Sequence, residues 1–183
     1  MVNDAIACME KVCRRLGKPL SQQAFLVSVP EQTAVLIARD DNSIFKLVAA
    51  YTISTSRFGV GQQRDSRQTP LGLHRVAKKF GDSLPPGAIF RGRKVTGQLT
   101  LENPHADIAH RILWLDGLEI GHNQGGEVDS YSRYIYIHGV GDESSLGRPA
   151  TQGCIHVAAD DLLPLYDQLQ IDSLVLIGEF TLS

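Results

Sequence analysis

The chain lacks long hydrophobic runs, has few cysteines and carries almost no net charge. No stretch of its 183 residues approaches the ~18 consecutive apolar residues that a membrane-spanning helix needs. Three cysteines are too few for a small scaffold held together by disulfides. Lys and Arg number 18 against 20 for Asp and Glu, a net charge of -2, which argues against binding nucleic acid by phosphate neutralisation. We therefore expect no membrane span and no nucleic-acid partner.

The length and composition are typical of one globular domain. Hydrophobic residues make up 43% and charged residues 21% of the chain, enough for a real core at the usual ~100–200 residues per domain. The first residues, MVNDAIACMEKVCRRLGKPL, lack the apolar segment and small residues of a secretory signal. We expect a cytoplasmic protein, or a periplasmic one if an export signal preceded this sequence.

Basic residues are concentrated in one segment. From Arg57 to Lys94 there are nine Lys and Arg against two Asp, a balance of +7, so the rest of the chain sums to -9. Such a segment can attract an anionic ligand through its local field. A solvated surface without a partner explains the charge equally well, and charge alone does not separate the two.

The first 20 residues predict a helix over 3–16. Asn3 is a candidate N-cap, and Gly17 followed by Pro19 ends the pattern. One apolar stripe contains Val2, Ile6, Met9, Cys13 and Leu16. The spacing of Cys8 and Cys13 fits neither a redox pair nor a zinc knuckle, so we expect ordinary buried or half-buried thiols.

Beyond residue 20 the pattern changes to short strands. Apolar and β-branched runs predict strands at 24–29, 33–38, 44–55, 73–79, 109–118 and 133–138. Polar, glycine-rich and proline-rich loops are predicted at 59–70, 81–87, 123–132 and 139–150. A helix capped by Ala159 or Asp160 runs to about Leu169. The prediction is a mainly β, mainly antiparallel fold with helices at its edges.

A histidine and a cysteine carry the strongest chemical signal. Alternation over 133–138 predicts that Tyr134, Tyr136 and His138 share one face of a strand. Cys154 follows 16 residues after His138, beyond a glycine-rich loop that can bring the two together. A thiol attacks a carbonyl as the thiolate, which a neighbouring imidazole can generate. A small buried thiol and an ordinary strand-end histidine are the alternative interpretation.

Further groups could complete this pair. Gly153 lets the backbone approach a substrate carbonyl closely, so its amide and that of Cys154 could form an oxyanion hole. No Asp or Asn is placed to orient the imidazole, which leaves the carbonyl of Gly139 as a candidate.

Metal and cofactor sites have no recognisable pattern. No HxxxH or CxxC pair occurs among the histidines and cysteines, and neither Gly59-x-Gly61 nor Gly139-x-Gly141 has the third glycine of a dinucleotide-binding loop. The histidines considered were His105, His110, His122, His138 and His156. We expect neither a metal nor a cofactor.

Several motifs together resemble a known family. Ile137-His138-Gly139 followed by Thr151-x-Gly153-Cys154-Ile155 resembles the signature of the L,D-transpeptidase (YkuD-type) catalytic domain. Residues 51–55 resemble that family's strand leading to its substrate cleft, and 69–72 resemble its Thr-Pro-x-Gly turn. The resemblance covers about 24–178.

The resemblance implies a fold and a chemistry. The fold would be a β-sandwich, with an N-terminal helix in 1–20 and the catalytic domain in 21–183, forming a single domain overall. Cys154 would be the nucleophile, His138 the general base and the Gly139 carbonyl its orienter. The family attacks the bond between the L-centre of meso-diaminopimelate and D-alanine in peptidoglycan stem peptides. The resulting thioacyl enzyme is resolved by an amine or by water.

The substrate contacts are less defined. Gln152 stands where the family usually has His, and His156 where it usually has Arg or Asn, which puts the acceptor preference in doubt. Candidate contacts with the substrate are Thr151, Gln152, His156 and Tyr136. Substrate carboxylates would meet Arg148, which is close to Cys154 in sequence, or Arg57, Arg64 and Arg67 in the basic segment.

Two enzymatic outcomes and one binding function follow. In the cytoplasm water would be the acceptor, which favours an L,D-carboxypeptidase of cell-wall recycling. With an amine acceptor the protein would be an L,D-transpeptidase that cross-links peptidoglycan, and without catalysis it would be a murein-peptide binding module. A penem-type β-lactam is the expected covalent inhibitor of Cys154.

Overall fold

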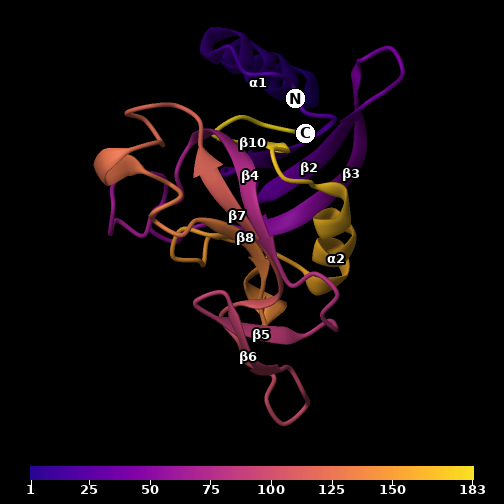
Figure 1. The fold of residues 1–183 in the computed structure, drawn as a ribbon, viewed down its shortest axis with the longest axis vertical. Helices are drawn as coiled ribbons and strands as arrows, with labels where there is room; N and C mark the ends of the chain where they lie inside the picture. Colours follow the sequence, from indigo (N-terminus) through magenta and orange to yellow (C-terminus); the bar gives the residue numbers. More distant parts are fainter.

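A computed structural model describes residues 1–183, and most of its regular structure is β. Two helices accompany ten strands (Figure 1). The elements are α1 (Val2–Leu16), β1 (Gln23–Ser28), β2 (Thr33–Arg39), β3 (Phe45–Ser54), β4 (Gly72–Phe80), β5 (Ala88–Arg91), β6 (Lys94–Gln98), β7 (Ala109–Gly117), β8 (Tyr136–Gly139), β9 (Ile155–Val157), α2 (Ala159–Gln168) and β10 (Leu174–Gly178). This confirms the mainly β fold with an N-terminal helix and a helix after Cys154. Neither helix is long and apolar enough to cross a membrane.

The sheet closes on itself. Its strand order is β4-β10-β1-β2-β3-β9-β8-β7-β5-β6, and β4 also pairs with β7. Eight strands thus form a ring, while the β5–β6 hairpin extends from the edge of β7 (Figure 1). Most pairs are antiparallel, as predicted, but β1–β10 and β8–β9 are parallel. The second of these parallel pairs carries the candidate catalytic residues.

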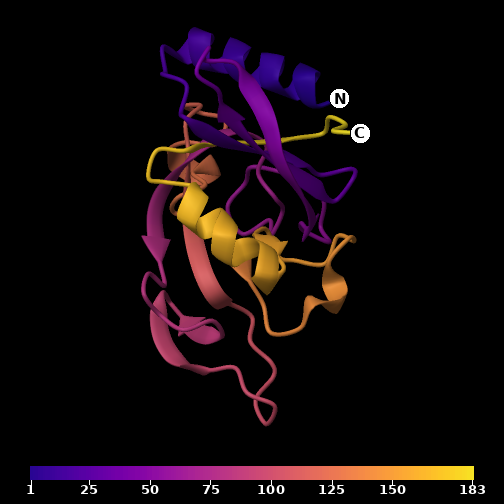
Figure 2. The same cartoon turned by 90° about the vertical axis from the view of Figure 1, so that its right-hand side faces the viewer.

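The main core lies between the strands of the ring and α2. Strand alternation directs one side chain in two toward this core, such as Phe25, Ile53 and Ile137. Leu162 and Leu165 of α2 pack against them, and Figure 2 shows α2 lying along the sheet. The carboxylate of Glu143 accepts a hydrogen bond from the first amide of α2 at 2.6 Å.

A second core joins α1 to the other face of the sheet. The predicted stripe is confirmed, with Met9 and Cys13 buried against β1, β2 and β10. The helix ends at Gly17 in the left-handed conformation, φ 61°, as expected. Cys8, expected to be buried or half-buried, is instead exposed because it lies off this stripe.

The predicted N-cap of α1 is also wrong. The helix begins at Val2, so Asn3 already lies inside it. The amino group of Met1 donates to the carbonyl of Thr181 at 2.6 Å, which holds the start of the helix beside the C-terminal segment. The two termini accordingly lie side by side in Figures 1 and 2.

The strand predicted from residue 133 begins only at Tyr136. Tyr134 has φ 58° and its amide donates to the carbonyl of Tyr131, which closes a turn before the strand. Tyr134 is therefore 52% exposed, whereas Tyr136 and His138 are buried, and the predicted shared face holds only for the last two. The other five predicted strands are confirmed with small shifts of their ends.

Candidate active site

The parallel pairing of β8 and β9 brings the candidate residues together. His138 on β8 lies opposite His156 on β9, and Cys154 directly precedes β9. The sulfur of Cys154 accepts a hydrogen bond from the amide of Tyr136 at 3.4 Å and donates to the carbonyl of Tyr134 at 3.5 Å. The backbone that leads into β8 therefore holds the thiol.

His138 is buried, with only 3% of its surface exposed. Its Nδ1 lies 2.8 Å from the carbonyl oxygen of Gly139, the partner expected from the sequence. Because a carbonyl only accepts, Nδ1 carries the proton and Nε2 is left as an acceptor. Burial lowers the pKa of His138 to about 4, so the ring is neutral at pH 7 and able to take a proton.

The thiol is neutral as well. Burial raises the pKa of Cys154 to about 11, against the opposing effects of the Tyr136 amide and the positive charge of Arg133. No hydrogen bond joins the thiol to His138 in this structure, because the thiol donates to Tyr134. Catalytic hydrogen bonds often tighten only when substrate binds. The resting pair is thus a thiol and an imidazole, and proton transfer has to accompany attack.

Two threonines fix the backbone that carries the thiol. Thr151 Oγ1 donates to the carbonyl of Cys154 at 2.7 Å and accepts from the amide of Gly153 at 3.2 Å. Thr69 Oγ1 donates to the carbonyl of Gly153 at 3.1 Å. Gly153 has φ 121°, and a Cβ there would lie 3.3 Å from the carbonyl of Gln68. Only glycine suits this turn.

This arrangement revises the expected oxyanion hole. Because the Gly153 amide is already bonded to Thr151, it does not point freely at a substrate. The amide of Cys154 has no hydrogen-bond partner, so it remains as the one free donor of the predicted pair. Thr151, expected to contact substrate, has its hydroxyl committed to the backbone of this turn.

A cavity of about 410 Å³ opens beside the thiol. Five predicted site residues line it, namely Cys154, His138, His156, Thr151 and Gln152. Its other walls come from residues 105–108 and from the loop after β8. The exposed side chain of Gln152 lies at its rim, where it can reach a bound ligand.

His156 contributes a polar atom that nothing in the protein satisfies. Its ring lies 4.6 Å from that of His138, measured between ring centres. Its Nδ1 is buried and has no hydrogen-bond partner. Burial, together with the neighbouring His138, lowers the pKa of His156 to about 3, so this ring is also neutral. A buried polar atom without a partner in a cavity wall is a place for a polar group of a ligand or for water.

The other candidate substrate contacts, Tyr136, Arg148, Arg57, Arg64 and Arg67, do not line the cavity. Tyr136 is 5% exposed, and its hydroxyl accepts a hydrogen bond from Arg93 at 3.0 Å. Arg148 is exposed, and the loop that carries it is fixed to β3, where Ser54 Oγ donates to the carbonyl of Arg148 at 2.7 Å. Arg57 is exposed and stacks on Phe58.

Arg133 is a site residue that the sequence reasoning missed. Its guanidinium donates to the carbonyls of Gly61, Gln62 and Gln68 at 3.2, 2.8 and 2.7 Å. It has no carboxylate partner, and its charge lowers the pKa of Cys154. Arg133 therefore ties the loop before β4 to the site. No sequence pattern marks such a residue, because its partners are main-chain oxygens.

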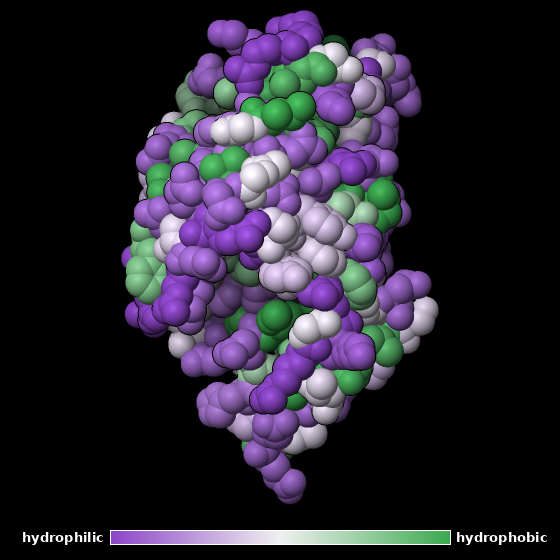
Figure 3. Space-filling view, turned by 60° about the vertical axis from the view of Figure 1, so that its left-hand side comes forward, coloured by the Kyte–Doolittle hydropathy of each residue, from purple (hydrophilic) through white to green (hydrophobic).

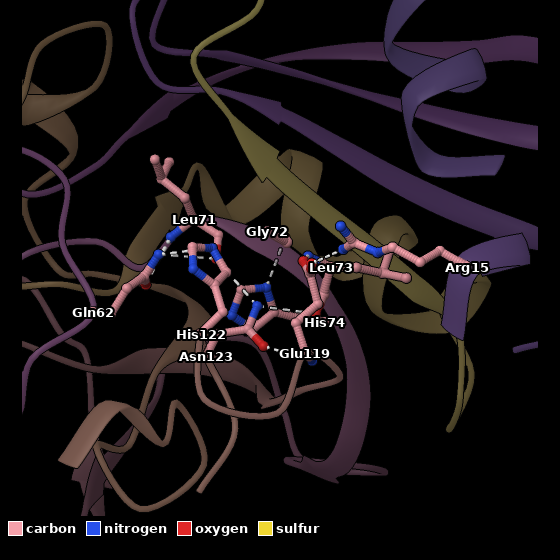
Figure 4. Close-up of polar contacts among 9 residues, drawn as sticks. All are labelled: Arg15, Gln62, Leu71, Gly72, Leu73, His74, Glu119, His122 and Asn123. Carbon is pink, nitrogen blue, oxygen red and sulfur yellow. Dashed lines mark hydrogen bonds and ion pairs between the residues drawn. The ribbon is translucent and has the colours of Figure 1, made fainter. Parts of the chain in front are cut away.

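The same loop is held on its other side by a polar network (Figure 4). The side chain of Gln62 contacts His122 Nε2 at 3.1 Å and accepts from the amide of Leu71 at 3.1 Å. Asn123 donates to the carbonyls of Leu71 and Leu73, each at 3.1 Å. Residues 119–123 thereby brace the loop that leans on the Gly153 turn.

Glu119 extends this network to α1. Its carboxylate accepts from the amide of Leu73 at 2.8 Å and forms an ion pair with Arg15 of α1 (Figure 4). Contacts therefore run without a break from the N-terminal helix through residues 119–123 to the loop clamped by Arg133.

A thiol and a neutral imidazole on one cavity define the chemistry of a cysteine acyl-transfer site, and comparison with known proteins agrees. The model of the L,D-transpeptidase catalytic domain (YkuD) matches residues 22–177. The chain belongs to this family, a family of cysteine acyl-transferases and peptidases acting on peptidoglycan. No curated protein matches the sequence.

Solved structures share the fold at low sequence identity. Bd1075 of Bdellovibrio bacteriovorus has a TM-score of 0.56 and 15% identity, with 87% of this chain and 49% of that one covered. Pgp2, the helical cell shape determining protein of Campylobacter jejuni, has a TM-score of 0.54 and 15% identity, with 88% of this chain and 48% of that one covered. L,D-transpeptidase 3 of Mycobacterium tuberculosis, with a faropenem-derived adduct, has a TM-score of 0.52 and 14% identity, with 86% of this chain and 60% of that one covered. The chain thus spans between 48% and 60% of these proteins.

Proposed function

We propose that the protein is a cysteine peptidase that removes D-alanine from peptidoglycan stem tetrapeptides, an L,D-carboxypeptidase. The observation that carries the proposal is the neutral His138, fixed by the Gly139 carbonyl, on the same cavity as the Cys154 thiol. The family supports acyl transfer on such peptides. That water, and not an amine, accepts the acyl group is the further step of the proposal.

The first half of the reaction acylates the enzyme. The sulfur of Cys154 bonds to the carbonyl carbon of the L-centre while its proton passes to Nε2 of His138. The Cys154 amide donates to the oxygen that becomes negative. The C–N bond then breaks, and the departing amine of D-alanine takes the proton from His138.

The second half releases the peptide. A water molecule gives a proton to His138 and adds to the thioester carbonyl, after which the C–S bond breaks and the sulfur regains the proton. His156 supports water as the acceptor, because its unpartnered Nδ1 lies beside His138 in the cavity wall and offers a hydrogen bond to a small polar molecule.

We also propose that the reaction takes place in the cytoplasm, on soluble peptides. Fractionation of cells would test this location.

A product analysis tests the proposal. A disaccharide-tetrapeptide is incubated with the protein, alone and with an acceptor stem peptide, and analysed by mass spectrometry. We expect tripeptide and free D-alanine in both mixtures, none from Cys154→Ala, and undiminished product from Cys8→Ala, which changes an exposed thiol on α1. A cross-linked product would indicate transpeptidation instead. Binding without turnover would indicate a murein-peptide binding module.

A penem offers an independent test of the nucleophile. The Mycobacterium tuberculosis enzyme of the same fold was solved with a faropenem-derived adduct. We expect faropenem to form one covalent adduct, seen as an increase in protein mass, with the wild-type protein and with Cys8→Ala. We expect no adduct with Cys154→Ala. An adduct on the last variant would contradict the assignment of Cys154.

A further inference from the structure

Two basic side chains beside the aromatic cluster that packs against Cys154 have no acidic partner. Arg93, in the turn between β5 and β6, and Lys78, on β4, form none of the ion pairs in this structure. Both belong to the basic segment of the sequence. Neither lines the 410 Å³ cavity.

Both cations contact the Trp114 ring of one aromatic cluster. Trp114 and Tyr131 stack in parallel, with ring centres 4.1 Å apart. The Arg93 guanidinium lies 4.7 Å from the centre of the Trp114 ring and 5.0 Å from that of Tyr134. Lys78 Nζ lies 5.6 and 5.7 Å from the Trp114 and Tyr131 rings. Cation–π contacts hold both charges in place but neutralise neither.

The side chain of Tyr136 lies between Arg93 and the nucleophile. Arg93 donates to the hydroxyl of Tyr136 at 3.0 Å, and the amide of Tyr136 donates to the Cys154 sulfur at 3.4 Å. Arg93 also lies over Tyr134, whose carbonyl accepts the thiol hydrogen. Cys154 packs against the hydrophobic cluster that contains Trp114 and Tyr136. Arg93 is thus connected to the thiol through Tyr136, on the side of the hairpin.

The backbone places Arg93 at a strained position. Gly92 and Arg93 connect the paired residues Arg91 and Lys94, with φ values of 50° and 68°. A two-residue turn of this kind favours Asn or Gly, because side chains with a Cβ are disfavoured at positive φ. An arginine held there by contacts with Tyr136 and Trp114 is the kind of strained residue found at ligand sites.

The surface near the hairpin is shaped to receive a ligand. Figure 3 shows a face that is largely hydrophilic and is hollowed in its lower half, above the β5–β6 hairpin, with hydrophobic residues at the floor of the hollow. A free carboxylate of a peptide would supply the negative partner that Arg93 and Lys78 lack.

We propose that Arg93, supported by Lys78, is a carboxylate-binding subsite that seats a free carboxylate of the peptide while Cys154 attacks. As a statement about the substrate it rests on the proposed function. The carboxylate is either that of the diamino acid side chain or that of the terminal D-alanine. Arg93 and Lys78 would thus take the place that the sequence assigned to Arg148 and Arg57.

A pair of small reagents tests the subsite without any peptidase activity. Iodoacetate and iodoacetamide alkylate thiols by the same displacement of iodide, but only iodoacetate carries a carboxylate. We expect the ratio of their rates, iodoacetate over iodoacetamide, to be higher at Cys154 than at the exposed Cys8 of the same protein. In Arg93→Gln this ratio should fall at Cys154 by about twofold, the effect of through-space attraction over roughly 10 Å in water, with a smaller fall in Lys78→Gln. Arg14→Gln, an exposed arginine of α1, should leave it unchanged.

The iodoacetamide rate is the internal reference for each variant. Any change in the ionisation or accessibility of the thiol alters both rates alike, so the ratio isolates the effect of the reagent's carboxylate. Equal ratios at Cys154 and Cys8, or no fall in Arg93→Gln, would overturn the subsite even if the peptidase assay succeeds. Conversely, a fall in the ratio with no peptide cleavage would uphold the subsite chemistry and overturn only the peptidase proposal.

Three tetrapeptides then identify the carboxylate, one unmodified, one amidated on the diamino acid side chain and one ending in D-alaninamide. We expect Arg93→Gln to raise KM about tenfold or more for the unmodified peptide, as for loss of a charge-assisted hydrogen bond. If amidation of one carboxylate removes the effect of Arg93→Gln on KM, that carboxylate is the one that Arg93 binds. Equal effects of Arg93→Gln on all three peptides would contradict the proposal.

Discussion

At the scale of single residues, the site depends on a half-buried thiol and a buried imidazole that are both uncharged at rest. Burial raises the pKa of Cys154 and lowers that of His138. A thiolate and imidazolium pair would need both shifts in the opposite direction. The reactivity of the thiol should therefore follow its own ionisation unless a bound substrate draws the proton to His138.

This difference predicts two separate pH profiles. Alkylation of Cys154 by iodoacetamide should rise about tenfold per pH unit toward a midpoint near pH 11, the pKa of the thiol. Peptide cleavage needs neutral His138 and should fall only as the pH approaches about 4. Mass spectrometry after timed quenching measures the alkylation profile, and the rate of product release measures the cleavage profile. An alkylation rate that is already constant above pH 8 would show an ion pair at rest.

Arg133 acts on the same thiol as a positioning residue. Arg133→Met removes the charge and the three carbonyl contacts, so we expect a higher pKa for Cys154 and a loss of about 2–3 kcal/mol in the free energy of unfolding. Arg133→Lys should restore the thiol pKa more than the stability, because it keeps the charge but not the fork of donors. Alkylation profiles and urea unfolding measure the two effects. Equal thiol pKa values in all three proteins would limit Arg133 to a structural role.

At the scale of elements, the loop before β4 is positioned by its neighbours. The carboxylate of Glu119 accepts a hydrogen bond from the buried amide of Leu73 and forms an ion pair with the exposed Arg15. These two contacts differ in how much they contribute to stability. Exposed ion pairs contribute at most about 1 kcal/mol, whereas a buried amide left without its acceptor costs about 1–3 kcal/mol.

We therefore expect Glu119→Ala to destabilise the protein more than Arg15→Ala. Urea unfolding should show a loss of about 1–3 kcal/mol for the first variant and less than about 1 kcal/mol for the second. The double variant should resemble Glu119→Ala alone, since the ion pair is already lost there. Equal losses in the two single variants would mean that the ion pair, not the Leu73 amide, is the main contact.

How much the sequence predicts depends on how far each element follows a regular burial pattern. The strands with clear apolar runs, such as β1 and β7, and the stripe of α1 are confirmed. No strand was predicted for β5, β6, β9 or β10. All residues of β6 are exposed and β9 has three residues, whereas β10 is a buried apolar run that was not assigned. The strand predicted from Arg133 is shortened because side-chain contacts and a left-handed Tyr134 override alternation.

The candidate site divides in the same way. Local motifs predicted Cys154, His138 and the Gly139 carbonyl, and the structure places all three together. Arg133 and Arg93 act on main-chain oxygens and aromatic faces from distant segments. Such contacts depend on the tertiary fold, so no spacing in the sequence predicts them.

At the scale of the whole molecule, three histidines with strongly lowered pKa values make folding sensitive to acid. Burial lowers the pKa values of His74, His138 and His156 to about 4, 4 and 3 from an ordinary 6.5. Above pH 6.5 both the folded and the unfolded chain keep these rings neutral. Below it the unfolded chain takes up protons first, so stability is lost as the pH falls from 6.5 toward 4.

We expect the free energy of unfolding to fall by up to about 4 kcal/mol per pH unit near pH 5, the slope for three protons taken up on unfolding. Urea unfolding between pH 4.5 and 7.5 measures it. His74→Gln should reduce this slope by about 1.4 kcal/mol per pH unit, the contribution of one proton, whatever its effect on stability at pH 7. A flat profile in this range would show that the rings are already charged in the folded protein.

The closed ring of strands has a consequence for how the chain is made. β10 lies between β1 and β4, although it follows both of them in the sequence by more than 90 residues. A nascent chain can complete β8 and β9 while β1 and β4 still present open edges that invite pairing with other chains. The Cys154 turn can thus form in a molecule whose sheet is still open, and a ribosome that stalls before β10 would release a protein prone to aggregate.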